Sequence, residues 1–390
     1  MRLLFAYSVR NLLARRLTTG LTVAGLSLVV FVFVAALMLA RGLETTLVGT
    51  GLPDNVLILR KGATTEIASG IYRDQANILQ IQPEAALGTA GRPLAFGELV
   101  VLITLTKRGE ASTANVILRG TAPEALRLRP QVRLTRGRAW RPGTTEVIAG
   151  TQVAGRFERA GLGQRLRFAK RDWTIVGLFD AAGSGFESEI WGDADQFMAA
   201  YGRDSFSSFT LRLSHPALFD ALKTRLENDP RLSFQIKRER DYYAEKSAML
   251  SAFITLLASV LTIIFGIGAI LGAAMTMHGS VSNRTAEIGT LRALGFARRH
   301  ILAALIAESL LIGGAAGLCG IAGASLLQTV TVSTMNWSTF SELAFGFALS
   351  PGIVARGLLF ALIMGFLGGL APATRAARLP IVAALGTRNG

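Results

Sequence analysis

The sequence is poor in the residues that build redox and metal sites. It contains one cysteine, Cys319, and three histidines, His215, His278 and His300, which lie far apart in the chain. A single cysteine forms no internal disulfide, so any exported part must fold on its hydrophobic core alone. HExxH motifs and the Cys/His spacings of zinc sites are absent from the sequence. We therefore expect no metal site in this chain.

Charged residues are also scarce. They make up 17% of the chain, whereas hydrophobic residues make up 51%. The formal net charge of +15 would suit a nucleic-acid-binding protein, but the arginines form no stripe with aromatic residues between them. We therefore expect a membrane protein with a sizeable water-exposed part and no nucleic-acid partner.

Motifs for nucleotide binding and catalysis are missing as well. GxxxxGK[ST] does not occur, and the Lys-Ser/Thr pairs Lys223-Thr224 and Lys246-Ser247 lack the preceding glycine. The stretch AAGSGFES resembles a nucleophile elbow, but Ala182 stands where GxSxG requires glycine. No convincing Ser/His/Asp set can be assembled. We expect no catalytic residue and no cofactor bound by this chain.

Four apolar runs are long enough to cross a bilayer. We expect transmembrane helices at residues 17–40, 241–277, 301–330 and 351–374, with the first extended as a stalk to about residue 50 and the second beginning as a stalk. A cleaved signal peptide is the alternative for the first run. That run is longer than a usual signal sequence, and Met38 occupies the position where a small residue is needed before cleavage.

The distribution of arginine predicts the topology. Among the short segments beside the spans, basic residues occur in residues 1–16, in the 278–300 loop and in the 375–390 tail, whereas residues 331–350 contain no Lys or Arg. Positively charged segments beside a span stay on the cytoplasmic side. Both termini and the 278–300 loop are therefore predicted to be cytoplasmic, and the 51–240 domain and the 331–350 loop to be extracytoplasmic.

Small residues within the spans predict close helix packing. GxxxG pairs let helix backbones approach each other in lipid. There are three, Gly268/Gly272, Gly313/Gly317 and Gly365/Gly369. The spans lack the paired carboxylates and lysines of proton-coupled carriers, with Glu308 as the exception. We expect Glu308 to lie near the cytoplasmic interface and to meet Arg299 or a neighbouring helix.

The domain between the first two spans mixes strand-like and helix-like segments without a strict βαβ alternation. This predicts one α+β domain. Strands are expected at residues 55–61, 98–108, 113–120, 146–150, 164–170, 172–180, 207–214 and 231–237, and helices at 151–161, 193–202 and 215–229. The acidic cluster Glu187, Glu189, Asp193 and Asp195 lacks the glycine turn and closing glutamate of a calcium loop, so we expect a helix cap and a solvated loop.

A short charged helix is predicted in the 278–300 loop. Ile288, Leu291 and Leu294 would share one face, Arg284, Glu287 and Arg292 the other, and Gly295 would end the helix. Such a helix is too short to be stable alone and too polar to enter lipid. Two interpretations remain open on physical grounds, a helix docked on a partner protein and a helix lying among anionic headgroups.

A family resemblance favours the first interpretation. NRTAEIGTLRALGFARRHI resembles the cytoplasmic loop of the FtsX-like permeases, which are the membrane subunits of MacB-type ABC transporters. Further stretches resemble other parts of that family, at residues 7–28, 133–157, 163–181 and 368–385. The first of these is similar to the amphipathic helix that leads into the family's first span, so the resemblance implies a cytoplasmic amphipathic helix at residues 1–16. The resemblance covers essentially the whole chain.

The resemblance carries expectations about fold and partners. It implies four spans, a large domain between the first and second, and a bacterial inner-membrane location. It also implies a second permease copy, as homodimer or heterodimer, and an ATPase subunit that binds ATP and magnesium. The coupling helix on that ATPase would comprise Arg284, Glu287, Ile288, Gly289, Leu291, Arg292, Leu294 and Gly295.

The expected function is that of a permease subunit which moves an extracytoplasmic lipid, lipoprotein, peptide or drug, with a periplasmic adaptor protein as a further partner. The alternative is a mechanotransmitter that activates a cell-wall hydrolase. A membrane-anchored enzyme and a signalling receptor fit less well, since neither a catalytic constellation nor a long cytoplasmic segment is present.

Overall fold

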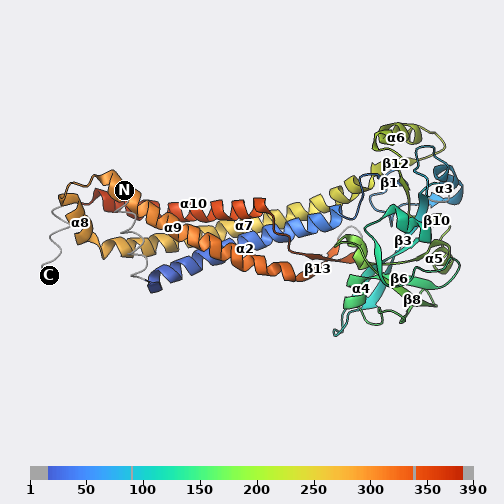
Figure 1. Cartoon of the computed structure of the whole chain (residues 1–390), viewed down its shortest axis with the longest axis horizontal. Helices are drawn as coiled ribbons and strands as arrows, with labels where there is room; N and C mark the ends of the chain where they lie inside the picture. Colours follow the sequence, from blue (N-terminus) through green and yellow to red (C-terminus); the bar gives the residue numbers. More distant parts are fainter. Residues whose placement is uncertain (1–15, 89–90, 337–339, 381–390) are drawn as a thin grey trace. The chain divides into compact units, whose positions relative to one another are not determined.

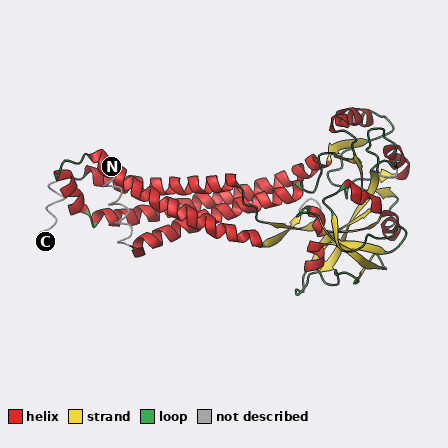
Figure 2. Ribbon diagram, in the orientation of Figure 1, coloured by secondary structure: helices red, strands yellow, loops and turns green. Residues whose placement is uncertain are grey.

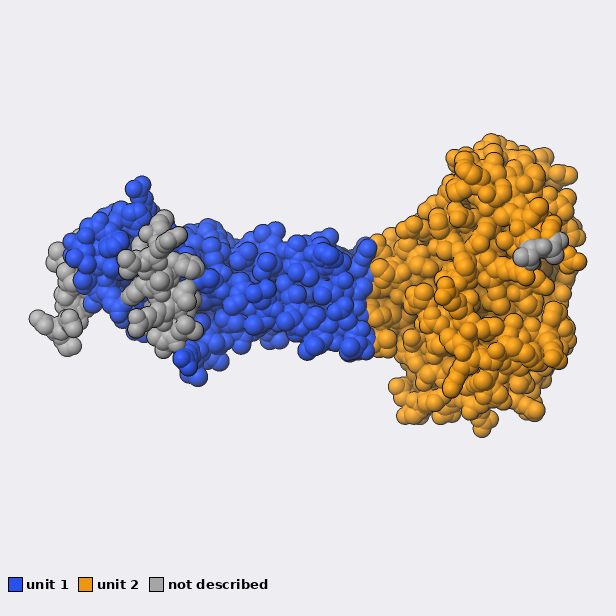
Figure 3. Space-filling view, viewed as in Figure 1, with its two compact units in different colours: residues 1–41, 251–330, 347–390 blue, residues 42–250, 331–346 orange. Residues whose placement is uncertain are grey.

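The computed structural model describes residues 16–88, 91–336 and 340–380. The expected amphipathic segment before residue 16 and the end of the tail lie outside the described residues. The chain forms two compact units, which Figure 3 distinguishes by colour. The helical unit comprises residues 1–41, 251–330 and 347–390, and the sheet unit comprises residues 42–250 and 331–346.

The helical unit is built from four long helices, drawn in Figures 1 and 2. They are α2 (Arg16–Val48), α7 (Glu239–Ser282), α9 (Arg298–Ser325) and α10 (Pro351–Arg378). With the 3-10 turn η4 (Leu326–Thr329) that continues α9, each is long and apolar enough to cross a membrane. The prediction of four spanning helices is confirmed at this level. Both α2 and α7 continue without a break into residues of the sheet unit.

Glycine allows α9 and α10 to pack closely. A Cβ added at Gly313 would lie 2.7 Å from the Ala361 carbonyl oxygen, and one at Gly365 would lie 2.7 Å from that of Ser309. Gly317 and Gly369 lie in the same contact. The third predicted pair is placed differently, because an added Cβ at Gly268 or Gly272 would meet no described heavy atom within 4 Å.

The sheet unit contains one ten-stranded mixed sheet. Its order is β12-β1-β11-β3-β4-β9-β6-β8-β5, with β7 paired to β8. The strands are β1 (Asn55–Arg60), β3 (Ala95–Thr106), β4 (Thr113–Thr121), β5 (Arg133–Gly137), β6 (Glu146–Gly150), β7 (Arg165–Phe168), β8 (Arg171–Asp180), β9 (Glu189–Asp193), β11 (Ser208–Arg212) and β12 (Phe234–Arg238). A separate two-stranded sheet pairs β2 (Ile71–Tyr72) with β10 (Ser205–Phe206).

Short helices pack against this sheet over two of its hydrophobic cores. One core gathers around Val56 and Phe209 beneath α3 (Arg73–Gln80) and α6 (Phe219–Glu227). The other gathers around Leu118 and Trp173 beneath α4 (Thr151–Arg156) and α5 (Ala194–Tyr201). Three 3-10 turns complete the domain, η1 (Pro123–Leu128), η2 (Gly185–Ser188) and η3 (Pro216–Leu218). The α+β prediction is therefore confirmed.

The structure differs from the sequence prediction at the 331–350 segment. In place of a loop, β13 (Thr331–Asn336) and β14 (Ser341–Gly346) form an antiparallel hairpin within the sheet unit. Glu342 forms ion pairs with Lys107 at 3.0 Å and with Arg156 at 2.7 Å. The only acidic residue of the segment thus attaches the hairpin to Lys107, which follows β3, and to Arg156 of α4, a contact that local sequence could not reveal.

Candidate functional site: helix α8 and a buried ion network

Helix α8 (Thr285–Ala293) forms where the sequence predicts a short charged helix. It ends at Gly295, whose φ is +94°. The Gly295 amide donates to the Arg292 carbonyl and the Phe296 amide to the Leu291 carbonyl. This pair of hydrogen bonds is the Schellman ending, which glycine adopts without the strain a side chain would bring.

One face of α8 packs on the ends of the long helices. Ile288 is buried together with Met277 and Val281 of α7, and with Ile301 and Leu305 of α9. Gly289 is also buried, and Leu291 contacts this cluster while remaining partly exposed. Burial of this apolar face supplies the stability that a nine-residue helix lacks in isolation.

An ion pair fixes the start of α8. The Arg284 guanidinium donates to the Glu308 carboxylate at 3.2 Å, and both residues are buried at 5% and 3% exposure. Glu287 lies 3.6 Å from Arg284 on the exposed side. Removing one partner of a buried pair leaves an uncompensated charge, which costs about 3–5 kcal/mol. The α8 backbone is therefore held against α9.

The structure corrects the predicted faces of this helix. Arg284 lies in the interior of the unit and pairs with Glu308, so this carboxylate meets a neighbouring helix, one of the two partners predicted for it. Arg292 donates to the Leu379 carbonyl at the end of α10. Leu294, expected to share a face with Ile288, is 73% exposed, whereas Ile288 is buried. The spacing of apolar residues along α8 could not predict that Arg284 is buried, because the carboxylate that compensates its charge, Glu308, lies on another helix.

The outward face of α8 is left uncovered by the described residues of this chain. It comprises Ala286, Glu287, Thr290, Ala293 and Leu294, all exposed. The face is small and mixed in polarity, with Leu294 as its largest apolar group. A helix anchored on one side and open on the other has the geometry of a docking element.

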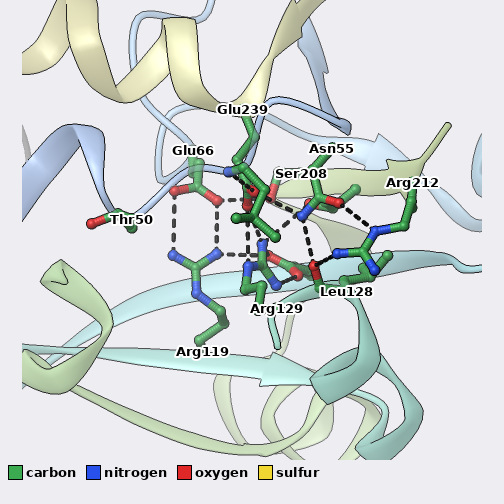
Figure 4. A network of polar contacts seen from close by, with 12 residues as sticks. Thr50, Asn55, Glu66, Arg119, Leu128, Arg129, Ser208, Arg212 and Glu239 are labelled. Carbon is green, nitrogen blue, oxygen red and sulfur yellow. Dashed lines mark hydrogen bonds and ion pairs between the residues drawn. The ribbon is translucent and has the colours of Figure 1, made fainter. Parts of the chain in front are cut away.

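A second constellation lies in the sheet unit, where two buried arginines meet four buried glutamates (Figure 4). Its members are Arg119, Arg129, Glu66, Glu98, Glu189 and Glu239, each at most 6% exposed. They come from β4, the end of η1, the segment after β1, β3, β9 and the first residue of α7. The network thus joins the sheet to the start of α7.

Arg119 holds three carboxylates at once. Its guanidinium donates to both oxygens of Glu189, at 2.8 and 3.0 Å, to Glu66 at 2.8 Å and to Glu98 at 2.7 Å. Ser208 adds a hydrogen bond to Glu66 at 2.9 Å. Such bidentate, charge-assisted bonds are geometrically specific. They fix β3, β4 and β9 in one register.

Arg129 ties α7 into the same network. It donates to Glu239 at 2.8 and 3.1 Å and shares Glu98 with Arg119. The other oxygen of Glu239 accepts from the Asn55 amide at 2.8 Å and the Leu52 backbone amide at 3.1 Å. Glu239 therefore connects the first turn of α7 to β1 and to the end of η1.

An aromatic ring completes the network. The Phe186 ring lies 4.8 Å from the Arg129 guanidinium carbon and 5.3 Å from that of Arg119. Phe186 is fully buried and meets Trp191 edge-on at 5.2 Å. Phe186 lies in η2, which connects β8 to β9, and its ring is a cation–π partner of both arginines in the interior.

The network carries more acid than base. Four carboxylates face two guanidiniums, a formal excess of two negative charges. Desolvation raises the pKa of Glu189 in spite of Arg119. For Glu98, desolvation is outweighed by the attraction of Arg129 and Arg119, and its pKa is lowered. Glu189 is therefore the carboxyl group most easily protonated in this pair.

The predicted acidic cluster is divided among different roles. Asp193 caps α5 by accepting from the Gln196 amide, as expected for a cap, and Glu189 belongs to the buried network. Glu187 accepts from the Ala181 and Gly183 amides, and Asp195 pairs with Arg73. Within the described ranges no group of three His, Cys, Asp or Glu side chains is placed to hold a metal ion. The expected solvated loop is wrong for Glu187 and Glu189, which are buried.

Comparisons with known proteins identify the family. Residues 19–229 match the family described as MacB-like periplasmic core domain, and residues 259–381 match the family described as FtsX-like permease C-terminal. The buried network lies within the first match except for Glu239, and α8 lies within the second.

Several curated proteins are similar to this chain. The macrolide export ATP-binding/permease protein MacB of Bdellovibrio bacteriovorus is 24% identical over 96% of this chain and 60% of its own length. The uncharacterized ABC transporter permease YknZ of Bacillus subtilis is 28% identical over 51% of this chain and 49% of its own length. The chain thus spans about three fifths of the MacB relative and half of the YknZ relative.

One solved structure is also similar, the extracellular domain of the ABC-type transporter YknZ from Gram-positive bacteria, with a TM-score of 0.36 and 13% identity over 47% of this chain and 99% of that domain. The two family matches together span both the sheet unit and the helical unit. This chain belongs to the MacB-like and FtsX-like family of ABC transporter permeases.

Proposed function

We propose that this chain is the permease subunit of a MacB/FtsX-type transporter. An ABC ATPase on a partner polypeptide would hydrolyse ATP and drive movement of the sheet domain, which exports or extracts a lipid, lipoprotein, peptide or drug. The family membership supports this function. The observation that carries it is the geometry of α8, which is anchored inside by Arg284, Glu308 and Ile288 and open outside at Thr290 and Leu294.

In this proposal α8 receives the motion of the ATPase. A helix fixed by a buried ion pair and a packed isoleucine moves together with α9, so displacement at its outer face reaches the long helices without loss. The helices α2 and α7 then carry the motion, because each continues unbroken into the sheet unit. A second permease copy and a periplasmic adaptor would complete the assembly.

The test is substitution on the outward face of α8. Leu294→Asp should reduce co-purification of the ATPase and its stimulated hydrolysis by about tenfold or more, since an exposed leucine at the centre of a small interface contributes at least about 1.4 kcal/mol. The control is Leu87→Asp, which charges a similarly exposed leucine in the sheet unit. Retention of both ATPase association and stimulation in Leu294→Asp would refute the role of α8.

A further inference from the structure

A cleft of about 510 Å³ lies in the sheet unit where two strands part. β3 and β4 pair from Leu99 opposite Gly120 to the hairpin end at Thr106 opposite Thr113. Ahead of Leu99, residues 95–98 of β3 pair instead with β11. The cleft occupies the resulting gap, and its volume falls in the range typical of small-ligand sites.

The cleft is walled by two short helices that belong to the two separate cores. Ala76, Asn77 and Gln80 of α3 line one side, and Ala194 and Asp195 at the start of α5 line the other. A single ion pair crosses between them, from Arg73 to Asp195 at 2.5 Å. Both side chains are more than half exposed, so this bridge is weak and can open when a ligand enters.

A buried hydroxyl in the cleft wall has no hydrogen-bond partner among the described residues. Thr121 is the last residue of β4, is fully buried and lines the cleft. Its hydroxyl oxygen makes no hydrogen bond to any described residue. A buried hydroxyl without a hydrogen-bond partner lowers the stability of a protein. Such a hydroxyl is retained where it serves a function, for example where it binds a ligand. The position of Thr121 therefore points to a hydrogen-bonding ligand.

The charge of the lining favours a cation. Three carboxylates, those of Glu124, Asp193 and Asp195, face one guanidinium, that of Arg73. Arg73 is already neutralised by Asp195, and Asp193 accepts from the Gly143 amide at 2.7 Å and the Gln196 amide. The exposed Glu124 is left to attract a positive group from the ligand.

The floor and one edge of the cleft suit a peptide. Phe96 and Phe206, both partly exposed, offer an apolar aromatic surface, and the buried Phe209 also lines the cleft. Among the described strands, none pairs with residues 95–97 on the edge of β3 that faces away from β11, and these residues line the cleft. An open strand edge beside side-chain pockets is the arrangement by which proteins bind extended peptide segments.

We propose that this cleft binds a short extended peptide in which a basic side chain stands next to an aromatic one. The basic group would pair with Glu124, the aromatic group would lie on Phe206, and the peptide backbone would hydrogen-bond to Thr121 and to the edge of β3. This inference deepens the proposed export function, on which it rests for the source of the peptide, by naming the substrate class.

The test uses the full chain in lipid nanodiscs and three capped tripeptides with phenylalanine on either side of lysine, glutamine or glutamate. Binding is measured by isothermal titration calorimetry. The lysine peptide should bind about tenfold more tightly than the glutamate peptide, and this ratio should shrink as salt is raised. Equal affinity of the lysine and glutamate peptides, or no detectable binding of the lysine peptide, would overturn the proposal.

Two variants locate the site. Glu124→Gln should reduce affinity for the lysine peptide several-fold and leave the glutamine peptide unchanged, whereas Glu158→Gln, an exposed glutamate outside the cleft, should change neither. Thr121→Val should weaken all three peptides without lowering the unfolding temperature, since it removes a hydroxyl that has no partner among the described residues. Unchanged affinity in both cleft variants would place the binding elsewhere.

The outcomes also separate this proposal from the function proposed above. Peptide binding is measured on the permease without an ATPase, so a failure of Leu294→Asp to disturb the ATPase leaves the cleft result standing. Conversely, if the permease responds to its ATPase through α8 but binds no lysine peptide, the proposed transport function stands and the proposed peptide site is refuted.

Discussion

At the scale of single residues, the main feature is that the buried carboxyl groups of Glu98 and Glu189 differ in their partners and in the direction of their pKa shifts. Glu98 bridges both arginines and is fully buried, while Glu189 contacts only Arg119 and the Trp191 indole. The pKa of Glu98 is lowered and that of Glu189 is raised. The pKa values of two carboxyl groups beside the same arginine thus shift in opposite directions, because desolvation outweighs the attraction of Arg119 at Glu189, whereas the attraction of two arginines outweighs desolvation at Glu98.

We predict that Glu98→Gln and Glu189→Gln differ in cost. Glu98→Gln removes the charge that compensates both guanidiniums and should lower the free energy of unfolding by about 3–5 kcal/mol. Glu189→Gln relieves part of the acidic excess and should cost less than about 1.5 kcal/mol. Unfolding followed by the fluorescence of the buried Trp191 measures both. Equal costs would show that the excess charge has no energetic effect.

The same pair predicts a pH dependence of known sign. A lowered pKa means that the stability from Glu98 is present above 4.5, the ordinary pKa of a glutamate side chain, and is lost as pH falls below it. A raised pKa means that Glu189 destabilises the fold progressively as pH rises above 4.5. The stability of Glu189→Gln relative to the natural chain should therefore improve between pH 4.5 and neutrality. A constant difference over that range would contradict the assignment.

At the scale of elements, the contact between α9 and α10 is set by the absence of side chains. Gly313 and Gly365 let the two backbones meet, and the neighbouring Gly314 points elsewhere, where an added Cβ would find only Leu362 at 3.9 Å. The hydrophobic effect offers little between helices in lipid, so closeness of backbones and van der Waals contact decide this packing. Larger apolar side chains at these glycines would separate the two backbones and could not replace the lost van der Waals contacts.

This contact yields a matched prediction within one helix. Gly313→Val places a side chain against the Ala361 carbonyl and should destabilise the protein by about 1–3 kcal/mol through overpacking. Gly314→Val introduces the same residue one position along, into ordinary contact distance, and should be close to neutral. Thermal unfolding in a mild detergent compares them. Equal unfolding temperatures for the two variants would argue against a close α9–α10 seam.

At the scale of the whole molecule, the chain alternates between its two units. It begins in the helical unit, enters the sheet unit through α2, returns through α7, and visits the sheet unit once more through the β13–β14 hairpin. Lys107 and Arg156 hold that hairpin through Glu342. The chain therefore crosses between the two units four times.

The corresponding prediction concerns sidedness. In a Cys319→Ser background, a cysteine at exposed Asp172 of the sheet unit should react with a membrane-impermeant maleimide in intact cells, because the basic loops are predicted to stay inside and this domain is predicted to lie outside. A cysteine at Thr290 of α8 should react only after lysis. Labelling of both positions in intact cells would contradict the topology on which the α8 proposal depends.

The sequence by itself determined the four long helices, the α+β character of the inserted domain, the short helix α8 and its glycine ending. Each of these depends on local properties, namely hydrophobic length, strand-like runs and the φ that Gly295 adopts. The cap at Asp193 was predicted for the same reason. Such features can be predicted without knowing which distant residues come into contact.

Tertiary structure alone decided the rest. The pairing of Arg284 with Glu308, the burial of Phe186 beside two arginines and the attachment of the 331–346 hairpin to Lys107 and Arg156 all join separate segments of the chain. The network of Arg119, Arg129 and four glutamates left no periodic signal, since its members are single charged residues on different strands, turns and helices. Charge compensation in a buried site acts through space, and the spacing of residues along a chain does not record it.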